Sequence, residues 1–393
     1  MTAKRGQRTF IVGVGCTAFI KMGLEAATKA LLDAGITYDA VEAAYVGYCY
    51  GDSCSGQRAL YNLGLTGIPI TNVNSNCSTG STALYHANTL VKSGIAECTL
   101  ALGFERMARG SLGNNWPDRP SPVKPFNMAS EETEELLSTG KNHGPGAPRM
   151  FDNAAQEYFD KYGAKLEHLA QIASKNHKHS VKNPYSQFRD GWTVEQVLNS
   201  PKICNQLTKF MCSPTSDGAA CCIVASEDFV HAHHLENQAI EIVAQALFTD
   251  DPSTFESKSA MNVVGYTMSR NCANKVFADA GFKSGEGRDQ VGVVELHDCF
   301  AANELLMYDA LGLCRPGEAH KMAERGDNTV RCFISLTLHE FLTIPMVLQY
   351  GGQYVINPSG GLEAKGHPLG ATGLGMHFYI TSEREASCLP KST

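Results

Sequence analysis

The chain of 393 residues is longer than one typical domain, so two packed units or a duplicated fold are expected. Hydrophobic residues make up 43% and charged residues 19%, which is typical of a globular α/β protein with a large core. The formal net charge of −7 argues against a nucleic-acid-binding protein, because phosphate recognition needs a clustered basic face. An anionic ligand would therefore need a local basic patch.

Strand-like runs and helical periodicities alternate along the first hundred residues. The predicted elements of this part are, in chain order, a strand at 10–15, a helix at 24–35, a strand at 41–50, a helix from about 78 to 91 and a strand at 97–104. This alternation predicts an α/β fold with mostly parallel strands. Gly13, Gly15 and Ala18 give a GxGxxA match after the first strand, but neither the immediate helix nor the later acidic residue of a dinucleotide site is clear.

The middle of the chain, from about 109 to 210, is predicted to leave the sheet, because proline and glycine cluster there and helical patterns follow at 152–177. A strand at 218–226 then returns to the core, and 239–248 begins a second unit. In both halves a helix that ends in Asp-Ala-Gly precedes a strand, which indicates a duplicated α/β unit. The predicted division is 1–235, with the loop domain inside it, and 236–393.

The sequence shows neither a recognisable metal-binding motif nor a recognisable targeting signal. The fourteen cysteines never show the paired short intervals of a structural zinc site, so no metal is expected. Residues 1–15 lack the apolar core of a signal peptide, which favours reduced thiols inside a cell. The apolar stretch 331–350 contains a histidine, a glutamate and a proline and is barely long enough to span a bilayer. A buried or surface insertion is therefore expected in place of a membrane span.

Two residues from distant segments suggest acyl transfer. Cys77, in NSNCSTGST, lies at the start of a predicted helix, whose N-terminus would lower the pKa of the thiol. His367 is bracketed by glycines in GHPLGATG and could exchange a proton near neutral pH. A thiol and an imidazole are the minimum set for acyl transfer. The alternatives are a small buried cysteine and a turn histidine bonded to the backbone.

Two further places could contribute. His297 and Cys299, in HDCF, follow an apolar strand at the end where ligands gather in open α/β sheets, although loop packing is the alternative. The densest basic run, 161–184, includes Lys175, His177 and Lys178. It could attract a nucleotide phosphate, while a solvated helix face is the more common role of such a run.

NCSTGST, HDCF and NPSGG…KGHPLGATG, in this order and at these separations, resemble the thiolase superfamily. HDCF points to the sterol-carrier-protein-type thiolases. Further matching stretches lie at 51–77, 100–107, 175–188 and 214–220. The resemblance implies a five-layered αβαβα thiolase fold of two similar halves with an inserted loop domain. It also implies cleavage of 3-ketoacyl-CoA with coenzyme A as a substrate, no permanently bound cofactor, a homodimer, and a peroxisomal location, with cytoplasm or mitochondrion as alternatives.

The resemblance also assigns roles by position. Cys77 resembles the nucleophile that takes the acyl group, and His367 resembles the histidine that activates it. Cys299 resembles the acid/base that moves the protons of coenzyme A and of the departing enolate, and His297 would assist at the oxyanion site. Lys175, His177 and Lys178, described above, are the candidates for binding the coenzyme A phosphates.

Three departures from the family pattern lead to further expectations. Residues 331–350 form an unusual insertion, and the loop before the first helix is short. The chain ends soon after the helix that follows GHPLGATG, so the second half is expected to lack its final strands and to leave an open sheet edge. Two alternatives to an active thiolase stay open: a catalytically impaired protein that binds acyl-CoA or lipid, and a condensing enzyme of the ketoacyl-synthase kind, against which HDCF argues.

Overall fold

The computed structural model describes residues 7–17, 22–107, 118–121, 123–329 and 352–382. The predicted insertion at 331–350 and Ala18 of the GxGxxA match therefore lie outside the described residues. Within the described ranges, no helix combines the length and the apolar character needed to cross a membrane.

A six-stranded sheet with the order β3-β2-β4-β5-β1-β6 forms the first half. Its strands are β1 (Thr9–Thr17), β2 (Ala43–Gly47), β3 (Ile70–Val73), β4 (Cys98–Glu105), β5 (Gly218–Ser226) and β6 (Ile240–Glu241). β2 pairs in parallel with β3 and β4, but β5 is antiparallel to both β4 and β1. The expectation of a mostly parallel sheet is correct only for β3-β2-β4. β5 arrives from a long excursion and not from a crossover helix, so its direction is not constrained to be parallel.

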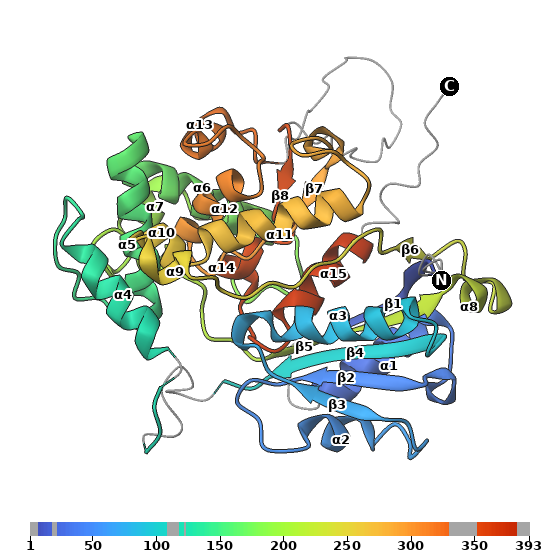
Figure 1. Ribbon diagram of the computed structural model, residues 1–393. Coiled ribbons are helices and arrows are strands. Elements are labelled where there is room, and N and C mark those ends of the chain that lie inside the picture. Colours follow the sequence, from blue (N-terminus) through green and yellow to red (C-terminus); the bar gives the residue numbers. More distant parts are fainter. Residues whose placement is uncertain (1–6, 18–21, 108–117, 122, 330–351, 383–393) are drawn as a thin grey trace, which may run out of the picture.

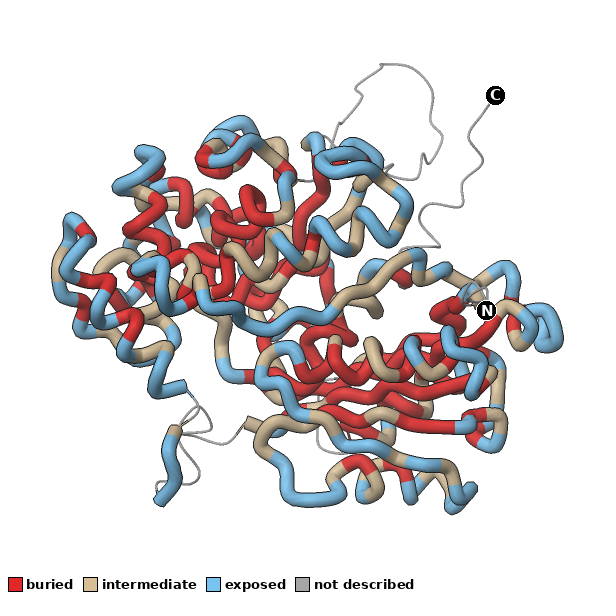
Figure 2. Tube along the Cα trace, viewed as in Figure 1, coloured by how far each residue is buried: buried red, intermediate tan, exposed pale blue. Residues whose placement is uncertain are grey.

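Helices cover both faces of this sheet. α1 (Met22–Ala34) packs on one face, while α3 (Thr79–Lys92) and α15 (Thr372–Ser382) lie side by side on the other, between the sheet and the rest of the molecule (Figure 1). The central strands β4 and β5 are buried (Figure 2). Alternate side chains of β5 enter two different cores, Ile223 on the α1 side and Val224 on the α3 side. The strand and helix predictions for this part are confirmed to within a few residues.

The two glycines of the GxGxxA match lie inside β1 and do not form a turn. α1 crosses directly over them, and a Cβ on Gly15 would lie 2.2 Å from the carbonyl oxygen of Ala26. Gly13 meets Ala30 in the same way, at 2.4 Å. These glycines therefore allow close packing of a helix on a strand. This role argues, as the sequence did, against a dinucleotide-binding site.

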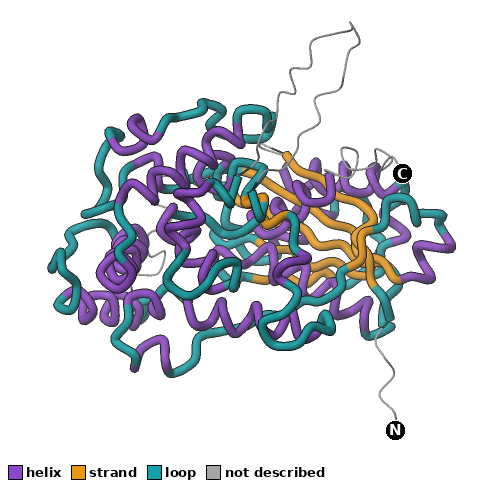
Figure 3. Tube along the Cα trace, turned by 90° about the horizontal axis from the view of Figure 1, so that it is seen from above, coloured by secondary structure: helices purple, strands orange, loops and turns teal. Residues whose placement is uncertain are grey.

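The excursion between β4 and β5 forms a group of helices at the end of the molecule away from the main sheet (Figure 3). They are α4 (Lys124–Glu134), α5 (Gly146–Tyr162), α6 (Leu166–Ser180) and α7 (Val194–Leu198). The helical patterns predicted at 152–177 correspond to two helices, α5 and α6. Gly163 ends α5 with φ 74°, a left-handed conformation that favours glycine and stops a helix.

The second half is largely helical and shares its core with α5 and α6. Its helices are α9 (Ser253–Glu256), α10 (Ala260–Val263), α11 (Tyr266–Asp279), α12 (Ala301–Ala310), α13 (Ala319–Arg325) and α14 (Gly361–Lys365). Two short helices, α2 (Ser55–Leu60) and α8 (Glu227–Ala232), belong to the first half, and α8 packs on β1 and β5. Only β7 (Val293–Val294) and β8 (Val355–Ile356) form a second sheet among the described residues, and they are parallel.

The segment 239–248 was predicted to begin the second unit. Only the two residues of β6 form a strand, and they pair with β1 of the first sheet. The strand predicted at the end of the second helix-strand repeat is also reduced to the two residues of β7. A strand needs a partner for its backbone groups, and among the described residues β7 has only the equally short β8.

Replacing Gly15 by alanine should destabilise the fold by about 1–3 kcal/mol, because the new Cβ would overlap the backbone of α1. Gly146, in the first turn of α5, is a matched control, since no atom lies within 4 Å of an added Cβ there. Gly146→Ala should leave the stability unchanged or raise it slightly. Urea unfolding of both variants measures the difference, and equal midpoints would contradict the close-packing argument.

Candidate active site

Cys77 lies in a short 3₁₀ turn, Asn76–Ser78, that runs directly into α3. Asn76 has φ 51°, a left-handed conformation that asparagine tolerates better than most residues. The hydroxyl of Thr79 donates to the carbonyl of Asn76 (2.6 Å) and accepts the backbone N–H of Ser75 (2.8 Å). The turn thus places the thiol at the beginning of the 14-residue helix, as the sequence predicted.

Three of the predicted groups meet in space. The sulfur of Cys77 and one ring nitrogen each of His297 and His367 all lie within 4.8 Å of one another. The two imidazoles are arranged edge to face, with ring centroids 4.8 Å apart and an interplanar angle of 80°. Residues separated by hundreds of positions in the sequence therefore form one cluster.

His367 is fixed by contacts on two sides. Its Nδ1 lies 2.7 Å from the hydroxyl of Thr372, and its backbone N–H donates to the hydroxyl of Ser216 at 3.0 Å. Nε2 is buried and has no hydrogen-bond partner among the described residues. This nitrogen is therefore available to a substrate or to the thiol.

Cys299 is buried in the loop between β7 and α12. Its carbonyl accepts a hydrogen bond from the backbone N–H of Ser213 at 2.9 Å. The next residue, Phe300, forms an antiparallel backbone β-bridge with Cys212. A charge on Cys77 is among the causes that raise the pKa of Cys299, so the two sulfurs are close enough to interact electrostatically. Cys299 thus belongs to the same region as the Cys77 cluster.

Burial controls the protonation of these groups. It raises the pKa of Cys77 to about 11, with a smaller contribution from the charge of Glu105. Burial also lowers the pKa of His297 to about 4 and that of His367 well below its usual value. The prediction that the helix N-terminus lowers the pKa of Cys77 is therefore wrong for the resting protein, because desolvation outweighs the helix dipole. At neutral pH the thiol is protonated and both imidazoles are neutral.

Glu105, at the end of β4, connects the two halves at the site and was not singled out from the sequence. Its carboxylate accepts the backbone N–H groups of Cys49 (3.1 Å), Tyr50 (3.2 Å) and Gly370 (2.9 Å). Gly370 approaches so closely that an added Cβ would lie 2.3 Å from the carbonyl oxygen of Phe104. The signal that could have revealed Glu105 is a single acidic residue at the end of an otherwise apolar strand.

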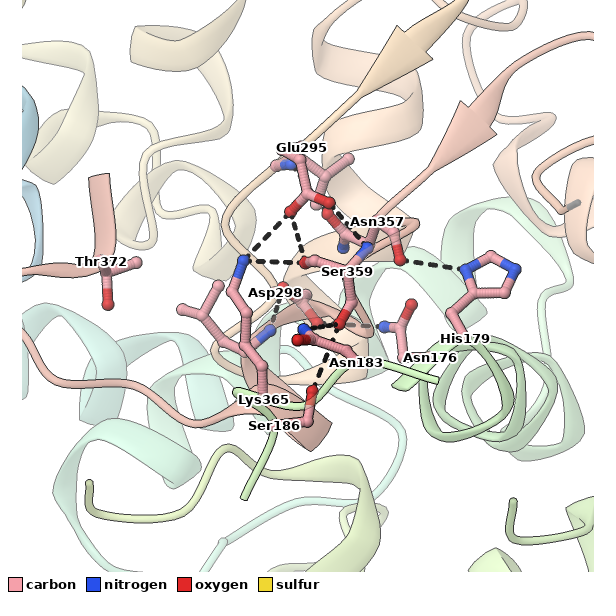
Figure 4. A network of polar contacts seen from close by, with 12 residues as sticks. Asn176, His179, Asn183, Ser186, Glu295, Asp298, Asn357, Ser359, Lys365 and Thr372 are labelled. Atoms are coloured by element: carbon pink, nitrogen blue, oxygen red, sulfur yellow. Dashed lines mark hydrogen bonds and ion pairs between the residues drawn. The ribbon is translucent and has the colours of Figure 1, made fainter. Parts of the chain in front are cut away.

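A polar network fixes the segment that leads from β8 to His367 (Figure 4). The carboxylate of Glu295 accepts hydrogen bonds from the ammonium of Lys365 at 3.1 Å and from both the backbone N–H and the hydroxyl of Ser359. The carbonyl of Ser359 in turn accepts the amide of Asn183 at 2.8 Å. The loop before His367 is therefore held by β7 on one side and by the segment after α6 on the other.

A second part of this network positions the loop that carries Cys299. The carboxylate of Asp298 accepts the backbone N–H of Leu362, at the start of α14, at 2.7 Å and the amide of Asn176 at 3.0 Å. The same Asn176 amide donates to Glu304 of α12 at 2.7 Å. Asp298 thereby connects the loop that carries Cys299 to α14, the helix that precedes His367.

The predicted basic face for coenzyme A phosphates does not form from the three residues that were proposed. Lys175 is buried in an ion pair with Glu304 and also donates to the carbonyl of Ile356 at 3.0 Å. His177 is buried with its Nε2 3.1 Å from the carbonyl of Phe210. Only Lys178 is exposed. The acidic partner of Lys175 lies 129 positions away, so the local sequence could not reveal it.

A cavity of about 600 Å³ lies beside the turn that carries His367. Its wall includes both neighbours of that histidine, Gly366 and Pro368, and the two residues that bond to it, Ser216 and Thr372. The volume is in the range of pockets that hold small organic ligands.

Comparisons with known proteins agree with this arrangement. The family model of the thiolase N-terminal domain matches residues 13–228, and that of the thiolase C-terminal domain matches 252–335. The chain is 50% identical over 387 residues to sterol carrier protein 2 of Rattus norvegicus, covering 95% of this chain and 65% of that protein. It thus spans just under two thirds of that relative's length. It is 41% identical to non-specific lipid-transfer protein-like 2 of Caenorhabditis elegans, covering 97% of this chain and 89% of that protein.

Solved structures show the same fold at low sequence identity. The Ltp2-ChsH2(DUF35) aldolase superposes with a TM-score of 0.71 at 20% identity, covering 98% of this chain and 93% of that chain. Human mitochondrial 3-ketoacyl-CoA thiolase in complex with CoA gives a TM-score of 0.61 at 18% identity, covering 96% and 92%. With a family match over more than half of its length, the chain belongs to the thiolase family and has the thiolase fold.

Proposed function

We propose that this thiolase-family acyltransferase cleaves 3-ketoacyl-CoA with coenzyme A through an acyl-enzyme on Cys77. The observation that carries the proposal is the cluster of one thiol and two imidazoles within 4.8 Å, with the buried Cys299 nearby. A thiol nucleophile, a base and a second proton carrier are what thiolysis of a carbon-carbon bond requires. The human neighbour with CoA bound supports coenzyme A as the substrate.

In the first half-reaction the thiol of Cys77 attacks the 3-keto carbon while Nε2 of His367 accepts its proton. The bond between the second and third carbons then breaks, which leaves the shortened acyl chain as a thioester on Cys77 and the enolate of acetyl-CoA. Cys299 protonates that enolate and becomes the thiolate. In the second half-reaction this thiolate takes the proton of coenzyme A, whose sulfur attacks the thioester and forms the shortened acyl-CoA. The released Cys77 thiolate regains its proton from His367.

The neutral state of the cluster determines how the attack proceeds. A thiol with a pKa near 11 beside an imidazole with a lowered pKa does not form a stable ion pair before the substrate arrives. The proton must therefore move during the attack, as in general-base catalysis. His297, which stays neutral for the same reason, supplies an N–H that can stabilise the developing oxyanion.

The binding-only alternative differs from this proposal at the first chemical step. A protein that holds acyl-CoA or lipid without turnover would bind the substrate tightly and leave Cys77 free. The peroxisomal location stays a prediction from the resemblance.

Incubation with acetoacetyl-CoA should add one acetyl group to Cys77, which peptide mass spectrometry detects. Cys77→Ser should remove the thioester label from this peptide, and His367→Asn should slow labelling by about 10²–10⁴-fold because the base is lost. Absence of label on the folded wild-type chain, together with tight acyl-CoA binding, would contradict the thiolase proposal and favour the binding-only alternative.

Alkylation of Cys77 by iodoacetamide should rise with pH up to about 11, since burial raises the pKa of the folded thiol. In the urea-unfolded protein the same peptide should reach its maximal rate above about pH 8.5, the pKa of an ordinary thiol. The raised pKa makes Cys77 less reactive than a free thiol at pH 7 in the folded state. A faster reaction of folded Cys77 at pH 7 would show that the thiolate is preformed.

The family resemblance implies a homodimer, and we further propose that the two copies meet through β3. β3 and the two-residue β6 are the edge strands of the main sheet, and Thr71 and Asn72 of β3 are exposed. An open edge offers unpaired backbone groups to a second copy, and a two-fold axis would place the same strand on both sides.

Light scattering should give about twice the chain mass of 42.4 kDa for the wild type. Thr71→Lys should weaken the dimer, because two like charges would then lie close together across the axis. Leu32→Lys, on the exposed side of α1, is the matched control and should stay dimeric. A monomeric wild type, or an equal effect of both substitutions, would exclude this interface.

A further inference from the structure

We propose that Cys77, His297 and His367 together bind a divalent cation of the zinc class, and that the bound ion reversibly blocks the nucleophile. One thiolate and two imidazoles form a donor set that zinc prefers in proteins. Among the described residues this cluster brings three such donor atoms within 4.8 Å of one another. The binding is argued from the geometry alone, whereas the inhibition rests on the proposed function.

The distances are close to those that a zinc site needs. With Zn–S near 2.3 Å and Zn–N near 2.1 Å, tetrahedral coordination places the donor atoms about 3.3–3.6 Å apart. Donor atoms that are now up to 4.8 Å apart would therefore have to approach one another by up to about 1.5 Å, within the reach of small side-chain rotations. Cys77 and His297 are only partly buried, so both side chains have room to move and an ion can reach them from solvent.

The surroundings of His367 provide an independent argument. Its Nε2 is buried without a hydrogen-bond partner among the described residues, and such a nitrogen gains free energy from any ligand that satisfies it. Its Nδ1 is held at 2.7 Å by the hydroxyl of Thr372. Zinc-binding histidines are typically oriented by an outer partner on the second ring nitrogen in this way.

The binding step is balanced without any oxidant or reductant. The S–H bond of Cys77 breaks, the proton passes to solvent, and the sulfur forms a bond to the ion. His297 and His367 each bind through a ring lone pair and release no proton. Three protein ligands leave a fourth position for water. The sulfur lone pair that would attack the substrate is then engaged, so acylation stops until the ion is removed.

The test measures metal binding and thiol protection on the metal-free, reduced protein. Equilibrium dialysis against Zn²⁺ alone should show a tight site of one equivalent, which Cys77→Ser and His297→Asn should both lose. Cys54→Ser is the matched control, since this exposed cysteine lies outside the cluster, and it should keep the site. At a free Zn²⁺ concentration ten times the measured Kd, alkylation of Cys77 should fall roughly tenfold, because about one site in eleven stays empty. A chelator should restore the original rate.

Two results would overturn the inference: an unchanged alkylation rate of wild-type Cys77 at saturating Zn²⁺, or one equivalent of zinc retained by both cluster variants. The protection measurement uses only the wild type, so it does not depend on whether a variant folds. Acetyl labelling of the metal-free protein tests the proposed function separately. Labelling without zinc protection would remove this inference alone, and protection without labelling would remove the thiolase proposal alone.

Discussion

The close contact between Gly370 and the end of β4 is the constraint on which the site depends. A side chain at this position would overlap the carbonyl of Phe104, and the backbone N–H of Gly370 is held by Glu105. Because Glu105 also binds the loop at 49–50, one carboxylate fixes both the segment that carries His367 and a loop bonded to the Cys77 turn. The catalytic geometry thus follows from backbone-to-backbone packing, which only glycine permits.

Partial desolvation of the clustered side chains determines the protonation state of the site. In a low-dielectric environment the charged forms of thiol and imidazole are both disfavoured, so the cluster rests in its neutral state. Neutral imidazoles can accept a proton during attack, and they are also the form that binds a metal ion. Proton transfer and metal binding would therefore compete for the same lone pairs. The buried network around Asp298 and Glu304 keeps these groups in register, because breaking such a paired arrangement costs about 3–5 kcal/mol.

The predictions from the sequence succeeded where the governing physics is local. The helix after Cys77 and the helix after GHPLGATG were found because periodicity and glycine positions are properties of a few neighbouring residues. They failed where a distant partner decides the outcome. Lys175 was a candidate for binding the coenzyme A phosphates, but it is buried in an ion pair with Glu304 of α12. The segment 239–248 was predicted to begin the second unit, yet Ile240 and Glu241 pair with β1 of the first sheet.

By itself, the sequence determined the α/β class, the elements that surround the main sheet and the four residues whose chemistry suits acyl transfer. The tertiary structure decided which of these side chains meet, where the pKa values lie and which charges are buried. The physical reason is that hydrogen bonding within a helix is local, whereas desolvation and ion pairing depend on every segment that packs around a group. Cys77 shows the difference, since its place at a helix start predicts a lowered pKa and its burial by the rest of the fold raises it.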